Sequence, residues 1–324
     1  HNILPNIGMN TSVPMFRNTV QVPIMLSFAA VGLTWFVNLE IALGLWLFAL
    51  LALVEKGVFA ILGMGSTEVV SVYGTPESPF LAHQGIGALM LFVIAGLWGA
   101  RRHLQRVARK AWTGRGIDDS GELLSYRAAS VTLVTGSAIM TAWLWLSGIP
   151  LLLALFLLAV ALAIFLALTR IVVEGGVAAA RSPMIASTFI VSGVGAPLVG
   201  TAGLVAMAFT YVWHGDVRTF VMASCANGLK LIDGVRRTRA LLWAIVLAIV
   251  VAAVGSTVTI LHLSYTHGGI NLHPWFFGAG PQAPFEFVAS KISNQPGVQW
   301  EGWLFKGIGA SLMGLLMYLR HHFL

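Results

Sequence analysis

Six apolar stretches of the chain have the length of membrane-spanning helices. A helix needs about 20 mostly apolar residues to cross the hydrocarbon core of a bilayer. The third and fourth stretches are separated only by a tight turn at Gly148-Ile149-Pro150, so we predict that they form a helical hairpin. We therefore predict an all-α, polytopic helical membrane protein of about six transmembrane helices, with spans at residues 41–63, 83–100, 126–148, 150–172, 240–263 and 303–318.

One further apolar stretch, residues 183–211, is long enough to span but is interrupted by helix-breaking residues. These are Gly193, Gly195, Pro197, Gly200 and Gly203. Broken backbone at membrane depth persists only where protein or a water-filled cavity covers it. We predict a re-entrant pair of short helices here. The alternative is a single kinked seventh span.

The first 37 residues differ in pattern from the rest of the chain. The apolar run at residues 22–36 is too short to span a bilayer, and Asn38 and Glu40 separate it from the first long span. We predict an N-terminal segment, 1–37, with a short apolar or re-entrant stretch, followed by a helical membrane domain, 38–324. Because the chain starts at His1, we expect further residues to precede it in the cell.

Basic residues predict which side of the membrane each loop faces. Six spans place on one side of the membrane the loop 101–125, residues 173–239 and the C-terminus. The other side has the loops 64–82 and 264–302, whose only lysine or arginine is Lys291. Lysine and arginine gather on cytoplasmic loops. We predict a bacterial inner-membrane protein with a cytoplasmic C-terminus and loop 101–125, and an outer loop at 264–302. The residues on the basic side are Arg101, Arg102, Arg106, Arg109, Lys110, Arg115, Arg181, Arg218, Lys230, Arg236, Arg237, Arg239 and Arg320.

Composition excludes a water-soluble enzyme. The chain is 57% hydrophobic and 10% charged, against about 25% charged in soluble domains. The net charge of +7 follows from the basic cytoplasmic side, so we expect no nucleic-acid partner. The single cysteine, Cys225, excludes disulfides and multi-cysteine metal sites.

Two ionisable residues lie inside predicted spans at a similar depth. Glu55 is in the first span and Lys306 in the last, both near the outer end. Ionisable groups within membranes usually face a partner or a watery path. They are candidates for a coupling-proton or substrate site, and the alternative is a structural ion pair or a snorkelling lysine.

A second candidate site lies before the broken stretch. Arg170 and Glu174 are four residues apart, so they lie on one helix face and can pair. The hydroxyls of Ser187, Thr188 and Ser192 follow in the region where discontinuous helices expose their ends, as at many transporter binding sites. The alternative is a salt bridge that ends the helix.

Histidines raise the question of haem or pigment ligation. Only His83 and His262 lie at matching depth, both near outer span ends, and interfacial polar histidines are the default interpretation. The sequence has no serine–histidine–aspartate constellation and no HExxH motif. We expect no enzymatic activity, no cofactor and no bound metal. The glycines at 85, 87, 307, 309 and 314 predict close contacts between helices instead.

Several stretches together resemble a known family. They read SFAAVG (27–32), NLE (38–40), DD (118–119), LSYR (124–127), RIVVEGG (170–176) and LHLSY (261–265), followed by the aromatic outer loop. The chain resembles the C-terminal half of bacterial integral membrane proteins related to the oligopeptide-transporter superfamily. The resemblance covers nearly the whole chain. It implies proton-coupled uptake of a small peptide or chelate-like solute, with a missing N-terminal half as a partner.

Two functions therefore stay open at this point. The first is a membrane transporter or transporter-derived subunit. The second is a non-catalytic accessory or scaffold subunit of a larger respiratory or photosynthetic membrane complex. In either case the partners are the lipid bilayer and a missing half or other membrane subunits.

Overall fold

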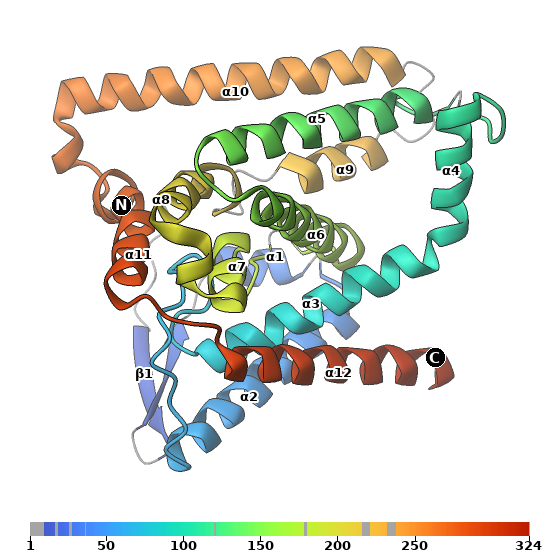
Figure 1. Cartoon of the computed structure of the whole chain (residues 1–324). Helices are drawn as coiled ribbons and strands as arrows, with labels where there is room; N and C mark the ends of the chain where they lie inside the picture. The colour runs from blue at the N-terminus through green and yellow to red at the C-terminus, as the bar shows by residue number, and fades with distance from the viewer. Residues whose placement is uncertain are drawn as a thin grey trace.

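The computed structural model is helical almost throughout, with one small hairpin (Figure 1). It describes residues 10–16, 19–25, 28–35, 37–119, 121–177, 180–215, 221–231 and 238–323. Arg218, Arg236 and Arg237 of the basic side, and Ser27 of the first resembling stretch, lie outside these ranges. The elements are β1 (Asn10–Met15), β2 (Val20–Met25), α1 (Phe28–Thr34), α2 (Leu39–Ile61), α3 (Pro79–Gly99), α4 (Arg101–Thr113), α5 (Tyr126–Leu146), α6 (Leu151–Gly175), α7 (Ala186–Val194), α8 (Ala196–His214), α9 (Val221–Leu231), α10 (Thr238–His267), η2 (Gly269–Asn271), η3 (Trp275–Ala279), α11 (Gly280–Asn294) and α12 (Trp300–Phe323).

The six predicted spans are confirmed as long apolar helices. They correspond to α2, α3, α5, α6, α10 and α12, and a seventh helix of sufficient length and apolarity among the described residues is α8. The predicted boundaries are too short at several ends. The last span was placed at 303–318, whereas α12 runs from Trp300 to Phe323, because its ends carry charged and histidine residues that a hydropathy pattern excludes.

The broken segment is also confirmed. Gly195 separates α7 from α8 with φ at 86°, and Gly200 interrupts α8 with φ at 73°. Both values lie in the left-handed region that glycine adopts without steric cost. Beyond Gly200, residues 201–214 extend about 21 Å, less than the roughly 30 Å of a bilayer core. The geometry is that of short helices in series, and α8 as a whole, kinked at Gly200, still has the length and apolarity of a candidate span.

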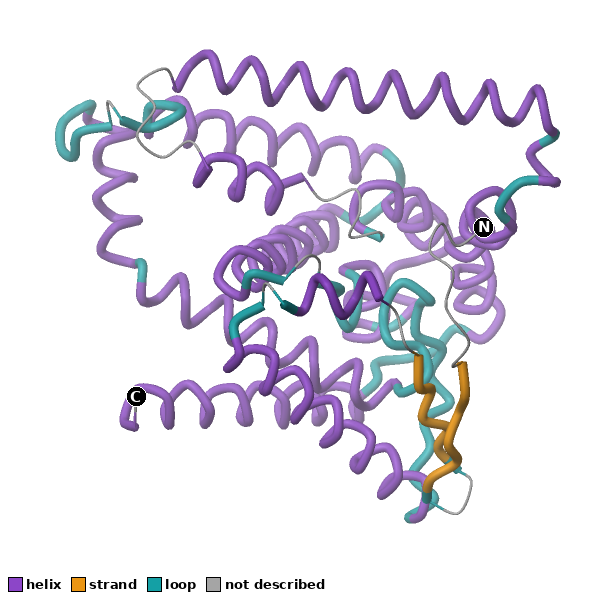
Figure 2. Tube along the Cα trace, turned by 180° about the vertical axis from the view of Figure 1, so that it is seen from behind, coloured by secondary structure: helices purple, strands orange, loops and turns teal. Residues whose placement is uncertain are grey.

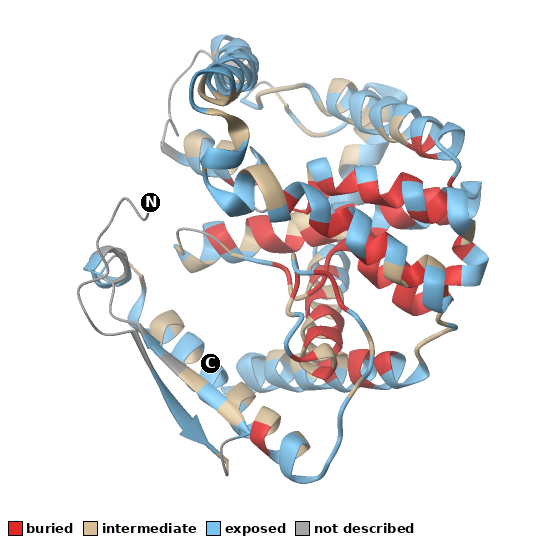
Figure 3. Ribbon diagram, turned by 90° about the vertical axis from the view of Figure 1, so that its left-hand side faces the viewer, coloured by how far each residue is buried: buried red, intermediate tan, exposed pale blue. Residues whose placement is uncertain are grey.

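The buried core lies around α6, the helix at the centre of Figure 1. Buried residues cluster on α6, α7, α8 and the inner face of α3, as Figure 3 shows in red. Helix α7 is buried along nearly its whole length. Protein therefore covers α7 and the inner face of α8 at the break, which explains how the interrupted backbone is tolerated.

Helices α3 and α12 approach each other closely, as the glycine pattern predicts. A Cβ atom on Gly87 would collide with the backbone of Lys306, and one on Gly309 with the backbone of Gln84. Small residues let membrane helices pack backbone to backbone. This contact fixes the depth of Lys306 relative to α3.

The N-terminal segment differs from its prediction. Residues 20–25 form strand β2, which pairs antiparallel with β1 with Val13 opposite Val22, and only residues 28–34 are helical (Figure 2). The described part of the run at 22–36 thus consists of the end of a strand and a short helix. The β-branched residues at the beginning of this run favour a strand. The mean hydropathy of the run does not reveal this pattern.

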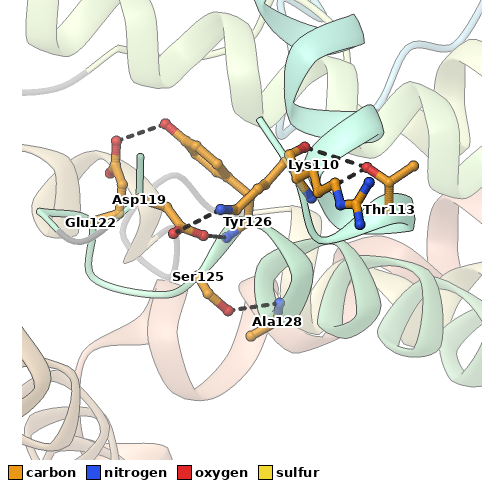
Figure 4. A network of polar contacts seen from close by, with 8 residues as sticks. Lys110, Thr113, Asp119, Glu122, Ser125, Tyr126 and Ala128 are labelled. Atoms are coloured by element: carbon orange, nitrogen blue, oxygen red, sulfur yellow. Dashed lines mark hydrogen bonds and ion pairs between the residues drawn. The ribbon is translucent and has the colours of Figure 1, made fainter. Parts of the chain in front are cut away.

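The basic loop 101–125 contains a helix that was not predicted. Helix α4 is exposed along its length and carries most of the basic residues of this loop. The junction with α5 is held by polar contacts: Asp119 accepts a hydrogen bond from Tyr126 N at 3.1 Å and lies 3.8 Å from Lys110 Nζ, and Ser125 caps α5 by accepting from Ala128 N (Figure 4). The polar residues of this loop are therefore structural.

Several helix ends lie at opposite edges of the molecule. In Figure 1 helix α4, the start of α10 and the C-terminus lie at the right, whereas the α5–α6 turn and α11 lie at the left. Helix α11 lies within the predicted outer loop 264–302. This helix packs against α8 and buries Phe287 and Val288 there.

Two candidate spans have almost no protein around them. None of the apolar window of α10 is buried, and only 6% of that of α2. In Figure 1 α10 runs along the top edge of the molecule. Helix α2 contacts β2 and, through Phe59, Phe80 and Phe305, whereas an apolar helix as exposed as α10 requires lipid or another protein as its surroundings.

Candidate functional site

A buried ion pair lies where the loop between α2 and α3 meets the broken helix. Glu68 Oε2 and His83 Nε2 are joined by a hydrogen bond of 2.7 Å, and their side chains are only 4% and 1% exposed. Glu68 comes from the loop and His83 from the first turn of α3. Buried charges are rare unless they are paired, so this pair marks the site.

Two buried lysines surround this pair. The Lys306 ammonium group lies 4.4 Å and 4.3 Å from the ring centres of Phe189 and Trp303, and no described residue accepts a hydrogen bond from it. Lys291 on α11 lies over the Phe287 ring at 5.0 Å. Aromatic faces attract such cations most strongly where water is excluded. The site therefore holds two cations beside one carboxylate.

The break between α7 and α8 is held against this cluster. Trp303 Nε1 donates to Gly193 O at 3.0 Å, Gln299 N to Ser192 O at 3.0 Å, and Ala196 N to Pro296 O at 2.9 Å. These bonds satisfy backbone groups that the interruption of the helix leaves free. The segment before α12 and the first turn of α12 thus fix the position of the α7–α8 break relative to Lys306.

A cavity gives access to the cluster. It has a volume of about 310 Å³ and is lined by Thr67, Glu68, Val69, Ser290, Lys291, Asn294, Pro296 and Gln299. Both a carboxylate and an ammonium group border it. A small polar solute or a file of water molecules can therefore reach Glu68 from the outer-loop side.

The pKa of Glu68 reflects this environment. Burial acts to raise it, but the hydrogen bond and charge of His83, the Ser192 hydroxyl and the Lys291 charge together hold the pKa below the usual 4.5. Burial lowers the pKa of Lys291, against the attraction of Glu68. The carboxylate is therefore ionised at neutral pH in the folded protein.

This pKa predicts an acid-sensitive fold. Since the folded-state pKa of Glu68 lies below its unfolded value, its stabilising contribution is complete above about pH 4.5 and is lost as the pH falls through the folded value. We expect the melting temperature in detergent to fall as the pH drops below about 4.5. The Glu68→Gln variant should show a shallower fall, and an identical slope would contradict the assignment.

The structure does not pair Glu55 with Lys306, so the alternative of a structural ion pair between them is not observed among the described residues. With its amide oriented to donate, Gln84 lies 2.7 Å from Glu55 Oε1, and the carboxylate makes its contact there. Lys306 instead faces the rings of Phe189 and Trp303 and interacts electrostatically with Glu68. Depth along separate spans does not determine the side to which each residue points, and here Glu55 and Lys306 contact different neighbours.

Arg170 and Glu174 pair as their spacing predicts. Arg170 Nε lies 2.8 Å from Glu174 Oε1, and the guanidinium stacks 4.4 Å from the Phe92 ring of α3. Among the described residues, Glu174 makes no hydrogen bond to the hydroxyls of the broken segment. The pair therefore ends α6 and anchors it to α3, as the structural alternative proposed.

The predicted hydroxyls lie on the buried helix α7. Ser187, Thr188 and Ser192 are buried, and their oxygens make no hydrogen bond of good geometry to a described residue. Ser192 faces the Glu68 side of the helix. The sequence thus located the broken helix and its polar residues, although not their partners.

The two histidines considered for haem have different surroundings. His83 is buried against Glu68, whereas His262 is exposed on α10. Within the described ranges, no group of three or more histidine, cysteine, aspartate or glutamate residues could hold a metal ion.

Glu68 and Lys291 were missed as site residues. Both lie outside the predicted spans, where charged residues are ordinarily solvated. One signal was available for Lys291, since it is the only basic residue of the outer loops. For Glu68 the sequence offers none, because only the fold carries its loop into the core.

The fold and the buried charges define a multi-pass helical membrane protein with a polar site at a broken helix. The chain belongs to the family of unknown function DUF6785, which it matches over residues 3–324. No curated protein and no solved structure matches the chain. The function of this family is unknown, so the resemblance to oligopeptide transporters stays a prediction.

Proposed function

We propose that this protein is a membrane transporter, or a transporter-derived subunit, that couples uptake of a small peptide or chelate-like solute to proton movement. The observation that carries the proposal is the buried Glu68–His83 pair beside the α7–α8 break. Discontinuous helices commonly form substrate and ion sites in transporters. Ionisable groups buried in such proteins commonly relay protons.

The chemistry of the pair suits this role. A carboxylate and an imidazole in direct contact can pass one proton between them and to water in the adjoining cavity. Lys291 borders that cavity and Lys306 lies behind it, so protonation of Glu68 leaves their positive charge uncompensated. A carboxylate on the solute compensates that charge. Solute binding and proton binding are thereby linked.

We also propose the orientation and the location. The exposed basic helix α4 and the C-terminus lie at the end of the molecule opposite the outer loop, as Figure 1 shows. Positively charged segments favour the cytoplasmic side. These observations support our proposal of a bacterial inner membrane, with the Glu68 cavity opening toward the outer face.

Uptake into vesicles tests the proposal. The complete encoded protein is reconstituted with an inward proton gradient, and entry of dialanine or ferric citrate is followed together with internal pH. We expect Glu68→Gln to reduce uptake by at least about tenfold, as when a general acid–base group is lost. Glu77→Gln, at an 83% exposed side chain, should leave it unchanged. Equal uptake by both variants would refute the coupling role.

The exposure of α2 and α10 favours a second function, that of an accessory subunit in a larger membrane complex. Both helices are apolar and nearly free of protein contacts. Mild-detergent extraction followed by native electrophoresis separates the two proposals. Stoichiometric co-migrating membrane subunits would support a complex, whereas an isolated chain active in vesicles would exclude it.

A further inference from the structure

The two ends of the buried helix α7 are not equally neutralised. A helix carries partial negative charge at its C-terminus and partial positive charge at its N-terminus. At the C-terminal end, Trp303 donates to Gly193 O, and the Lys306 ammonium group stacks on Trp303 beside that glycine. At the N-terminal end, Ile185 supplies no capping side chain and the first turn holds no acidic residue.

The N-terminal end also retains free donors. The first hydrogen bond of the helix runs from Phe189 N to Ile185 O at 3.0 Å. The N–H groups of Ala186, Ser187 and Thr188 donate to no residue within the described part of the chain. Buried N–H groups are nearly always satisfied in native proteins, by a ligand or by water if not by the chain.

Side-chain donors gather at the same place from another helix. Ser187, Thr188 and Tyr211 are 0%, 1% and 6% exposed, and the Tyr211 hydroxyl, from α8, faces those of Ser187, Thr188 and Ser71. Among the described residues, the oxygens of Ser187, Thr188 and Tyr211 have no partner of good hydrogen-bond geometry. Three hydroxyls and three N–H groups therefore lie together, and the hydroxyl oxygens are the acceptors that the described residues bring to them.

We propose that the N-terminus of α7, with the hydroxyls of Ser187, Thr188 and Tyr211, binds a small monovalent anion. Hydroxyl and N–H donors together with the positive helix end favour negative charge, and the same helix end disfavours a cation. Glu68 faces Ser192, five residues along α7 and so about 7.5 Å away. Its charge is offset by His83 and the two lysines.

Tyr211 also borders an aromatic cavity. It has a volume of about 560 Å³, and the ring of Tyr211 forms part of its wall together with Tyr73, Trp275 and Phe285. An anion at α7 is either a free halide or the carboxylate of a solute whose apolar part occupies this cavity. Both share the chemistry of one negative charge accepted by hydroxyl and N–H donors.

Anion-dependent stability tests the site without any transport measurement. The melting temperature of the purified protein in detergent is recorded as chloride, bromide or acetate replaces bulky gluconate at constant ionic strength. We expect a saturable rise of a few degrees, as for any ligand that binds only the folded state. A response to halides identifies a free halide site, and a response to acetate alone identifies a carboxylate site.

Variants locate the effect. Tyr211→Phe and Ser187→Ala should each weaken the apparent affinity at least tenfold, whereas Tyr265→Phe, at an exposed tyrosine, should leave it unchanged. If Tyr211→Phe does not fold, Ser187→Ala carries the test. The absence of any difference between small anions and gluconate, as expected if water alone fills the site, would overturn the proposal. So would an unchanged response in Ser187→Ala. If the protein binds anions but shows no solute uptake into vesicles, only the transport proposal is refuted.

Discussion

Replacement of Glu68 by leucine is expected to lower the free energy of unfolding by roughly 3–5 kcal/mol, the usual loss when one partner of a buried ion pair is removed. Leucine has a similar volume, so the loss arises from charge and hydrogen bonding. His83 loses its 2.7 Å partner, and Lys291 and Lys306 lose the carboxylate nearest to them. Reversible unfolding in mixed micelles measures the difference.

A matched control and a second variant make this prediction specific. Glu77→Leu removes a carboxylate that pairs with Lys56 at 3.4 Å but is 83% exposed, and should cost less than about 1 kcal/mol. The double variant Glu68→Leu/Lys306→Met removes the uncompensated cation as well. It should recover part of the loss, with a coupling of about 0.5–3 kcal/mol between the two sites. A loss at Glu68 no larger than that at Glu77 would show that the pair contributes little.

Replacement of Gly309 by alanine is expected to be the most damaging single-methyl change in α12. The new Cβ would meet the backbone of Gln84, which cannot rotate away, so α3 and α12 must separate. Overpacking of a buried contact costs about 1–3 kcal/mol, and here the whole helix pair shifts. Because His83 and Lys306 lie on these helices, the spacing of the buried cluster changes as well.

The same helix provides the control for this variant. Gly307 is two residues away, and a Cβ there meets no atom within 4 Å. Gly307→Ala should be neutral or stabilising by up to about 1 kcal/mol, since alanine favours helix over glycine. Melting temperatures of both variants, measured in parallel, test the contact. Similar values for the two would contradict the close approach of α3 and α12.

The long helices were predictable because their signal is local. A run of about 20 apolar residues can cross lipid only as a helix or as a strand of a closed barrel. Clusters of glycine and proline then indicate where such a helix is interrupted. The Arg170–Glu174 pair was predictable for the same reason, since four residues on a helix define one face. Close helix contacts at Gly87 and Gly309 also follow from residue size alone.

The partners of the charged residues were not predictable from these patterns. Glu55 and Lys306 share a depth, yet Glu55 turns toward Gln84 and Lys306 toward Phe189 and Trp303. The β1–β2 hairpin was missed because an apolar average does not distinguish a short strand from a short helix.

The sequence by itself determined that this protein is a membrane protein. It also determined the ends of the six long apolar helices to within a few residues, and the break of one helix at Gly195. Only the tertiary structure decided that Glu68, from a loop, reaches His83 in the core, and that the broken helix is closed by the segment before α12. The physical reason is the distance along the chain over which each interaction acts. Hydropathy and backbone breaks act within a few turns of chain, whereas the pairing of buried charges depends on which helix faces come together.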